Sequence, residues 1–261
     1  MENIKLGLQI YSVREAFAED SVATLQRIGK MGYDGVELNY WSLPKEPAVI
    51  VQELKQAGLE CLGCMALWKD LQPDVLEDTL QACKILGASS MVIAAVEKAR
   101  LLEDPAYPKE AVQYMNMVGE KANALGICTG YHSHDMDSTK VVADTSFYEY
   151  VMDHTPEWFS MVIDTGNIMG GGDDPIALLK KYPGRTPVLH LKGYSQARDY
   201  LTPLWESELD MEELLTFALD HCGTKTIMVE FGQRRGDYEP FVWAEQSLIW
   251  LRQLLQRIGR I

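Results

Sequence analysis

Two of the chain's five histidines stand two residues apart, in the sequence Tyr131-His132-Ser133-His134-Asp135. They follow a short apolar run that ends at Cys128. In an extended segment, side chains two positions apart point to the same face. His132 and His134 are therefore candidates for a metal site at the end of a strand, and the start of a polar loop is the alternative interpretation.

Three later apolar runs close in the same way, each on a side chain that can bind a metal: Asp164, His190 and Glu230. Two imidazoles and two carboxylates form a mixed nitrogen and oxygen set. Such a set suits Mn²⁺, Co²⁺, Zn²⁺ or Fe²⁺ better than Mg²⁺ or Ca²⁺, which prefer oxygen ligands. Each residue alone could be a polar group satisfied at a strand end, and Asp164 could be a cap or turn acid. Four such strand ends together predict a divalent metal site.

The elements that must position these residues alternate along the chain. Short β-like runs cover residues 4–12, 36–38, 59–65, 90–94, 128–132, 160–164, 187–190 and 226–230. Segments of helical period cover residues 21–31, 47–57, 74–86, 108–125, 145–154, 175–182, 210–222 and 240–258. Eight strand–helix units in 261 residues predict a single-domain (β/α)₈ TIM barrel. A doubly wound sheet is the competing fold, but the glycine-rich fingerprint expected after its first strand is absent from the sequence.

In a TIM barrel the active site lies at the C-terminal ends of the strands, where residues far apart in sequence meet. Further polar and aromatic side chains at or after strand ends are then candidate substrate contacts: Gln9, Tyr11, Glu37, His134, Lys192 and Trp68. Glu37 stands in an apolar strand, and a buried acid is costly unless it is paired. We therefore expect it to bond to a ligand or to a neighbouring site residue. For Lys192 the alternative is a surface position, and for Trp68, as for Trp41 and Trp205, it is core or rim packing.

Composition limits the classes of partner. The net charge of −14 argues against nucleic acid, because phosphate backbones are bound by clustered Lys and Arg. No run approaches the roughly 18 apolar residues of a membrane span, and the opening residues lack a signal-peptide pattern. The five cysteines stand mostly in apolar surroundings, which indicates free thiols in a reducing, cytoplasmic compartment. The run 170–174, Gly-Gly-Gly-Asp-Asp, is interpreted as a mobile loop beside the active site.

With these residues in place, the chain resembles the sugar phosphate isomerase/epimerase superfamily, the xylose isomerase-like TIM barrels. The matching stretches are residues 8–14, 32–37, 130–135, 163–167, 190–192 and 229–230. The resemblance implies a divalent metal held at the ends of strands five to eight by glutamate, aspartate, histidine and glutamate. Asp164, His190 and Glu230 match three of these positions. His132 stands where the first glutamate is usual, as in the branch whose motif reads Tyr-His-Asn-His.

The resemblance also implies the chemistry. We expect a metal-dependent isomerase or epimerase acting on a sugar or polyol, which abstracts a proton next to a metal-bound carbonyl. Glu230 is the ligand and candidate base, and His132 is the fourth ligand or a second acid/base. A lyase or dehydratase acting on a keto-inositol or keto-glycoside is the close alternative, because it shares the enolate intermediate. A non-catalytic sugar-binding barrel is the alternative of another class. Homodimers are common among enzymes of this type, which makes a homodimer one candidate assembly, although the sequence does not determine the oligomeric state.

Overall fold

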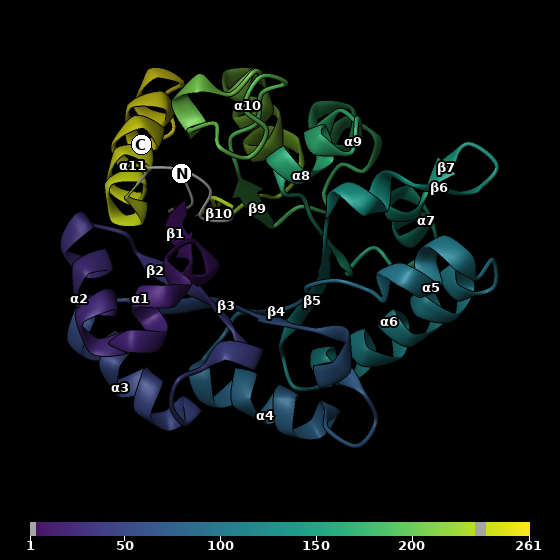
Figure 1. Cartoon of the computed structure of the whole chain (residues 1–261), viewed down its shortest axis with the longest axis horizontal. Helices are drawn as coiled ribbons and strands as arrows, with labels where there is room; N and C mark the ends of the chain where they lie inside the picture. Colours follow the sequence, from purple (N-terminus) through teal and green to yellow (C-terminus); the bar gives the residue numbers. More distant parts are fainter. Residues whose placement is uncertain (1–3, 233–238) are drawn as a thin grey trace.

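Eight parallel strands form the inner wall of a barrel, and helices cover its outside (Figure 1). The structure is a computed structural model, which describes residues 4–232 and 239–261. The strands follow the order β8-β5-β4-β3-β2-β1-β10-β9, and a bridge between Asp164 and His190 brings the two ends of the sheet together. Their bounds are β1 Lys5–Gln9, β2 Gly35–Asn39, β3 Glu60–Ala66, β4 Ser90–Ile93, β5 Cys128–His132, β8 Ser160–Val162, β9 Val188–Leu191 and β10 Thr226–Val229. The predicted TIM barrel is confirmed.

The helices alternate with the strands as expected. Their bounds are α1 Arg14–Glu19, α2 Ser21–Met31, α3 Pro47–Ala57, α4 Leu76–Leu86, α5 Lys98–Glu103, α6 Tyr107–Ala124, α7 Phe147–His154, α8 Thr165–Gly170, α9 Pro175–Lys181, α10 Met211–His221 and α11 Pro240–Arg257. A small hairpin, β6 Lys140–Val142 with β7 Thr145–Ser146, projects beside α7 (Figure 1). Local chemistry explains several boundaries. The Asp20 side chain caps α2, and Gly32 ends that helix with a left-handed φ of 98°.

Three short helices were not expected from the sequence. The first strand was predicted to reach Ser12 but ends at Gln9, because the Gln9 side chain accepts the Tyr11 N–H and begins a 3₁₀ turn that leads into α1. The sequence after Asp164 was interpreted as a turn but forms α8, and the Asp164 side chain caps this helix by accepting the Asn167 N–H, which was the alternative to its role as a ligand. Gly170, assigned to a mobile loop, is the last residue of α8. The third unexpected helix, α5, follows β4.

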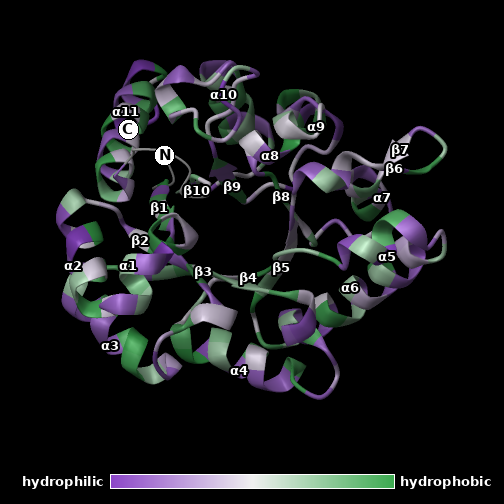
Figure 2. Ribbon diagram, in the orientation of Figure 1, coloured by the Kyte–Doolittle hydropathy of each residue, from purple (hydrophilic) through white to green (hydrophobic). Residues whose placement is uncertain are grey.

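Two buried apolar clusters hold these layers together. A small one fills the barrel interior and consists of Leu62, Met65, Val92, Ala94, Val162, Val188 and Met228. The large one lies between strands and helices. Strands buried on both faces are typical of parallel sheets. Figure 2 shows that the outer helices carry both hydrophobic and hydrophilic residues along their length. The barrel is therefore a solid scaffold, and its chemistry must lie at its mouth.

The structure also shows the state of the cysteines and the length and polarity of the helices. Within the described chain the cysteines are free thiols, and Cys61, Cys64, Cys83 and Cys222 are buried as expected. Cys128 is exposed because it is the first residue of β5, at the edge of the barrel. None of the helices in residues 4–232 and 239–261 is long and apolar enough to cross a lipid bilayer.

Candidate metal centre and substrate cavity

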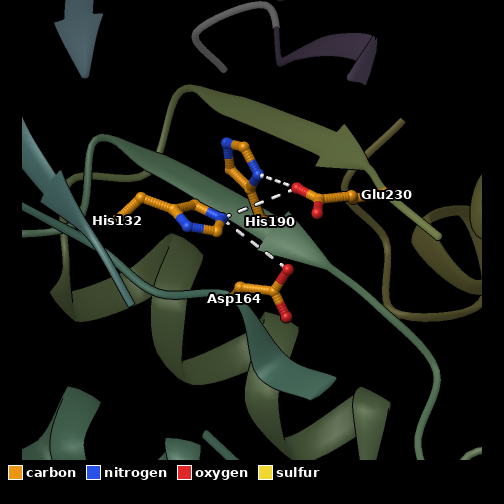
Figure 3. Close-up of side chains that lie close together, drawn as sticks. All are labelled: His132, Asp164, His190 and Glu230. Atoms are coloured by element: carbon orange, nitrogen blue, oxygen red, sulfur yellow. Dashed lines mark hydrogen bonds and ion pairs between the residues drawn. The ribbon is translucent and has the colours of Figure 1, made fainter. Parts of the chain in front are cut away.

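The four predicted metal ligands meet at one end of the barrel. His132 is the last residue of β5, Asp164 and Glu230 follow β8 and β10 closely, and His190 lies within β9. All four are buried, and one potential ligand atom from each lies within 4.8 Å of the others. Figure 3 shows the two rings and the two carboxylates turned toward one another. The sequence therefore predicted which side chains converge, and their role as ligands stays a prediction.

The distances in this cluster fit a single ion. The Glu230 Oε2 atom lies 2.9 Å from His190 Nδ1 and 3.5 Å from His132 Nε2, and the same His132 atom is 3.7 Å from Asp164 Oδ2 (Figure 3). Atoms bound to one ion at about 2.0–2.2 Å lie roughly 3 to 4 Å apart. Neither ring nitrogen of His132 has a hydrogen-bond partner among the described residues, although the ring is buried. Buried polar groups without a partner are rare. A metal bound in the cluster would be the partner of the His132 Nε2 atom, which faces Asp164 and Glu230.

Glu37 stands behind the cluster. Its Oε2 atom lies 3.1 Å from His190 Nε2 and accepts a hydrogen bond of 3.1 Å from Gln9 Nε2. Histidines that bind a metal through one ring nitrogen usually hold a carboxylate with the other, which fixes the orientation of the ring. The buried acid thus contacts a neighbouring site residue, as expected. This geometry favours a role through His190 over direct contact with a substrate.

Lys192 is buried beside the two carboxylates of the cluster. Its Nζ atom donates hydrogen bonds to Asp164 Oδ2 at 2.9 Å and to Glu230 Oε1 at 2.8 Å, and a third of 3.1 Å to Asn167 Oδ1. The alternative of a surface lysine is therefore wrong. The ammonium group is a positive charge built into the candidate metal site.

These contacts set the protonation states. Burial by itself would raise the pKa of Glu230, but the Lys192 charge, the nearby His132 ring and the hydrogen bond with His190 outweigh it and hold that pKa well below its usual range. The pKa of Asp164 is also lowered, because Lys192 overcomes the effect of burial. Burial would lower the pKa of His190, but Glu37 and Glu230 raise it to about 10. Without a metal, His190 is therefore protonated at neutral pH.

His134 is set apart from the four converging side chains. Its ring packs edge-on against that of His132, with centroids 5.0 Å apart, and its backbone N–H donates to Asp137 Oδ2 at 2.7 Å. Burial and the nearby charges of His132 and Lys192 lower the pKa of His134 to about 3, so its ring is neutral at physiological pH. The two histidines that drew attention in the sequence thus have different surroundings.

A cavity of about 640 Å³ opens above this cluster. Six of the residues proposed for catalysis, metal binding or substrate contact line it: Gln9, Tyr11, His132, His134, Lys192 and Glu230. Trp68 is not among the described residues that line it. Its ring packs against Tyr107 and Tyr114, with centroids 6.3 and 5.3 Å apart, so its position supports the packing alternative rather than substrate contact. Trp41 lines the cavity instead.

Several other residues that line the cavity are not marked as substrate contacts by any motif or period in the sequence. Asn167 belongs to the Asp-Thr-Gly-Asn stretch that was interpreted as a turn, and its side chain joins Lys192 to the backbone of Ser133. Arg198 and Tyr200 come from the long loop after β9. That loop has no periodic pattern, so only its contacts in the folded chain identify them.

Comparisons with known proteins agree with this architecture. A family model described as xylose isomerase-like TIM barrel matches residues 25–254. The inosose dehydratase of Salmonella typhimurium is 22% identical over 261 residues, covering 86% of this chain and 85% of that protein. A sugar phosphate isomerase/epimerase from Parabacteroides distasonis has a TM-score of 0.80 at 19% identity, covering 96% of this chain and 98% of that one. The IolI protein, solved with a bound zinc atom, has a TM-score of 0.71 at 15% identity and covers 98% of each chain.

Proposed function

The chain belongs to the family of xylose isomerase-like TIM barrels, and from that premise we propose that it is a metal-dependent enzyme that enolises a sugar or polyol ketone. Isomerisation or epimerisation is the first reaction class that such chemistry serves. The observation that carries the proposal is the convergence of His132, Asp164, His190 and Glu230, with Lys192 among them, below a cavity of about 640 Å³. Cavities of roughly 300–1,000 Å³ are typical of small-molecule sites.

The residues that would hold the metal are the four of that cluster, with His132 Nε2 and His190 Nδ1 as the nitrogen donors. The two imidazoles favour Mn²⁺, Co²⁺, Zn²⁺ or Fe²⁺ over Mg²⁺. When bound, the metal supplies a Lewis acid that stabilises negative charge developing on a carbonyl oxygen. The zinc atom of the IolI protein supports a divalent ion on this fold.

The chain's own side chains would handle the proton. Glu230 lines the cavity and is ionised, so it is the candidate acceptor of a proton from the carbon beside the carbonyl. Lys192 carries a proton and also lines the cavity, so it can donate a hydrogen bond to a substrate oxygen. Glu37 would keep the His190 ring in place from behind. These groups provide a base, a hydrogen-bond donor and a fixed ligand frame.

Elimination of water is the second candidate reaction, and one observation favours it. Of the carboxylates in the cluster, Glu230 lines the cavity, whereas Asp164 is fully buried and is not among the described lining residues. A symmetric epimerisation needs proton-transfer groups on both faces of the substrate, and the strand-five position holds His132. Elimination needs one base together with a donor that protonates the departing hydroxide, a part open to Lys192, which lines the cavity and carries a proton. The printed name of the Salmonella typhimurium relative, inosose dehydratase, points the same way.

A proton-exchange screen in D₂O tests the proposal. The metal-free protein is reloaded with Mn²⁺ and incubated with free ketoses, inososes and keto-glycosides, and NMR follows deuterium uptake at carbon. We expect metal-dependent exchange into at least one ketone, with an isomer or a dehydrated product distinguishing the two reactions. The Glu230→Gln variant should lose exchange, whereas Glu60→Gln, at an exposed strand start, should retain it. A protein that gains no metal and exchanges no proton would instead be a sugar-binding barrel without catalysis.

A further inference from the structure

The mouth of the cavity has two chemically different halves, and the division follows the strand order. Strands β10, β9, β8 and β5 adjoin one another and carry the four candidate ligands with Lys192. Strands β4, β3, β2 and β1 make the other half. Five apolar side chains at the ends of β2, β3 and β4 line it and are called here the apolar wall: Trp41, Met65, Leu67, Ala94 and Ala95. Among the described residues of this half that line the cavity, none is charged.

The Gln9 side chain in this half is bound by its neighbours. The Gln9 amide nitrogen lies 2.9 Å from Asn39 Oδ1 and 3.1 Å from Glu37 Oε2, and the Gln9 carbonyl oxygen accepts the Tyr11 N–H at 2.6 Å. Gln9 lines the cavity, but its amide is held at both ends. The Gln9 amide is therefore not available to the hydroxyls of a second sugar, which leaves the Tyr11 hydroxyl and the Asn39 amide nitrogen among the side-chain hydrogen-bonding groups that this half offers.

The apolar wall is the upper surface of the core that fills the barrel. Met65 and Ala94 belong to that core, and Trp41 and Leu67 are partly buried side chains packed against it. When an apolar ligand covers an apolar surface inside a cavity, the free energy of the complex falls, because apolar area leaves water. Rigid packing also means that the wall is present before a ligand arrives.

The size of the cavity completes the reasoning. At about 640 Å³ it lies within the roughly 300–1,000 Å³ that accommodates drug-sized ligands, so a single six-membered ring seated at the candidate ligands leaves room beside it. We propose that the substrate is a glycoside whose keto-sugar lies at the candidate metal ligands and whose uncharged aromatic aglycone lies against the apolar wall. The placement of the sugar rests on the proposed function. The preference for an aromatic group rests on the wall alone.

Equilibrium binding tests the wall without any reaction. Isothermal titration of the Mn²⁺-loaded protein with phenyl β-D-glucoside and methyl β-D-glucoside compares two ligands that differ only in the aglycone. We expect phenyl β-D-glucoside to bind roughly tenfold tighter or more, because a phenyl ring buries much more apolar area than a methyl group. Trp41→Ala removes part of the wall, and Ala95→Leu fills the space in front of it. Each should reduce the difference to less than about threefold.

The control is Trp158→Ala, because Trp158 is 40% exposed and is not among the described residues that line the cavity. It should leave the preference unchanged, and circular dichroism melts should show that all three variants are folded. Equal affinities for the two glucosides, no binding of phenyl β-D-glucoside, or a preference that survives both wall variants would each overturn the inference.

The same titrations separate this inference from the proposed function. If the aromatic preference is present but no ketone exchanges a proton in D₂O, the enzymatic proposal fails and the wall stands as a binding site. If exchange occurs but the preference is absent, the substrate class proposed here is wrong and the enzymatic proposal stands. Repeating the titration on chelator-treated protein should preserve the ratio of the two affinities, because the wall lies on strands that carry none of the four candidate ligands.

Discussion

Replacing Lys192 by methionine should tighten metal binding. The ammonium group lies 2.9 Å from Asp164 Oδ2, the oxygen that faces His132. An ion bound to that oxygen at about 2.1 Å can therefore be no farther than about 5 Å from the lysine charge. Even with the dielectric constant of water, a divalent ion and a unit positive charge about 5 Å apart repel each other by about 1.7 kcal/mol. Removal of the charge should strengthen binding by at least about tenfold.

The metal-free protein should respond in the opposite sense. Lys192 donates to Asp164 Oδ2 and Glu230 Oε1, and its loss leaves two buried carboxylates without that partner. Breaking a buried ion pair from one side costs about 3–5 kcal/mol of unfolding free energy. Lys192→Met should therefore melt at a lower temperature than the parent protein in chelator and recover much of the difference when metal is added.

The assay is a competition titration of Mn²⁺ against a chelating indicator, paired with thermal melts with and without metal. Lys181→Met is the matched control, because Lys181 lies at the surface and pairs with Glu149 at 2.8 Å. It should leave the metal affinity unchanged. An affinity of Lys192→Met that is equal to or weaker than that of the parent would refute the reasoning, since the lysine would then act by arranging the carboxylates and not by repelling the ion.

Three further predictions concern the metal centre and the packing of strand β5, which carries His132. Glu37→Gln should weaken metal binding by roughly 10- to 100-fold, because the His190 ring loses the carboxylate beside it. Glu60→Gln is the control. A metal affinity of Glu37→Gln equal to that of the parent would argue against this role of Glu37. The pKa of His190 is raised to about 10 from an ordinary value of 6.5, so its contribution to stability is fully present below about pH 6.5 and lost as the pH rises toward 10. The melting temperature of the metal-free protein should therefore fall as the pH rises from about 6.5 to 10. Metal binding at about pH 8 should release roughly one proton or more, which makes the heat of binding depend on the buffer. A heat of binding that does not depend on the buffer would contradict a protonated His190. Gly130→Ala should destabilise the fold by about 1–3 kcal/mol, because its Cβ would lie 2.6 Å from the backbone oxygen of Ser160 and push β5 from β8; denaturant melts equal to those of the parent would refute the close fit.

The parts of the fold that local chemistry controls were predictable from the sequence. The bounds of α2, α3 and β5 match the expected ranges. Pro47 opens α3 and Gly58 ends it in a left-handed conformation, and both signals can be read without knowledge of the rest of the chain. The four converging side chains were predictable for a related reason. In a barrel the C-terminal ends of the strands meet, so finding the strand ends also finds the site.

The features that depend on distant partners were not predictable in the same way. Lys192 was equally consistent with a surface position, because Asp164 and Glu230, which bury its charge, come from other strands. The helix α8 is only six residues long, and its capping residue Asp164 is also a candidate ligand, so its sequence resembles a turn. Trp41 and Trp68 occupy similar places after successive strands. Their surroundings differ because Tyr107 and Tyr114 pack against the ring of Trp68. Among the described ring contacts, neither tyrosine packs against Trp41.

The most direct test of the metal centre is a crystal structure of the Mn²⁺-loaded protein with anomalous diffraction data. The geometry predicts one strong anomalous peak about 2.0–2.3 Å from a nitrogen of His132, a nitrogen of His190 and an oxygen of each of Asp164 and Glu230. A crystal with no such peak, or with the ion bound away from these four side chains, would contradict the assignment of a metal centre to the mouth of the barrel.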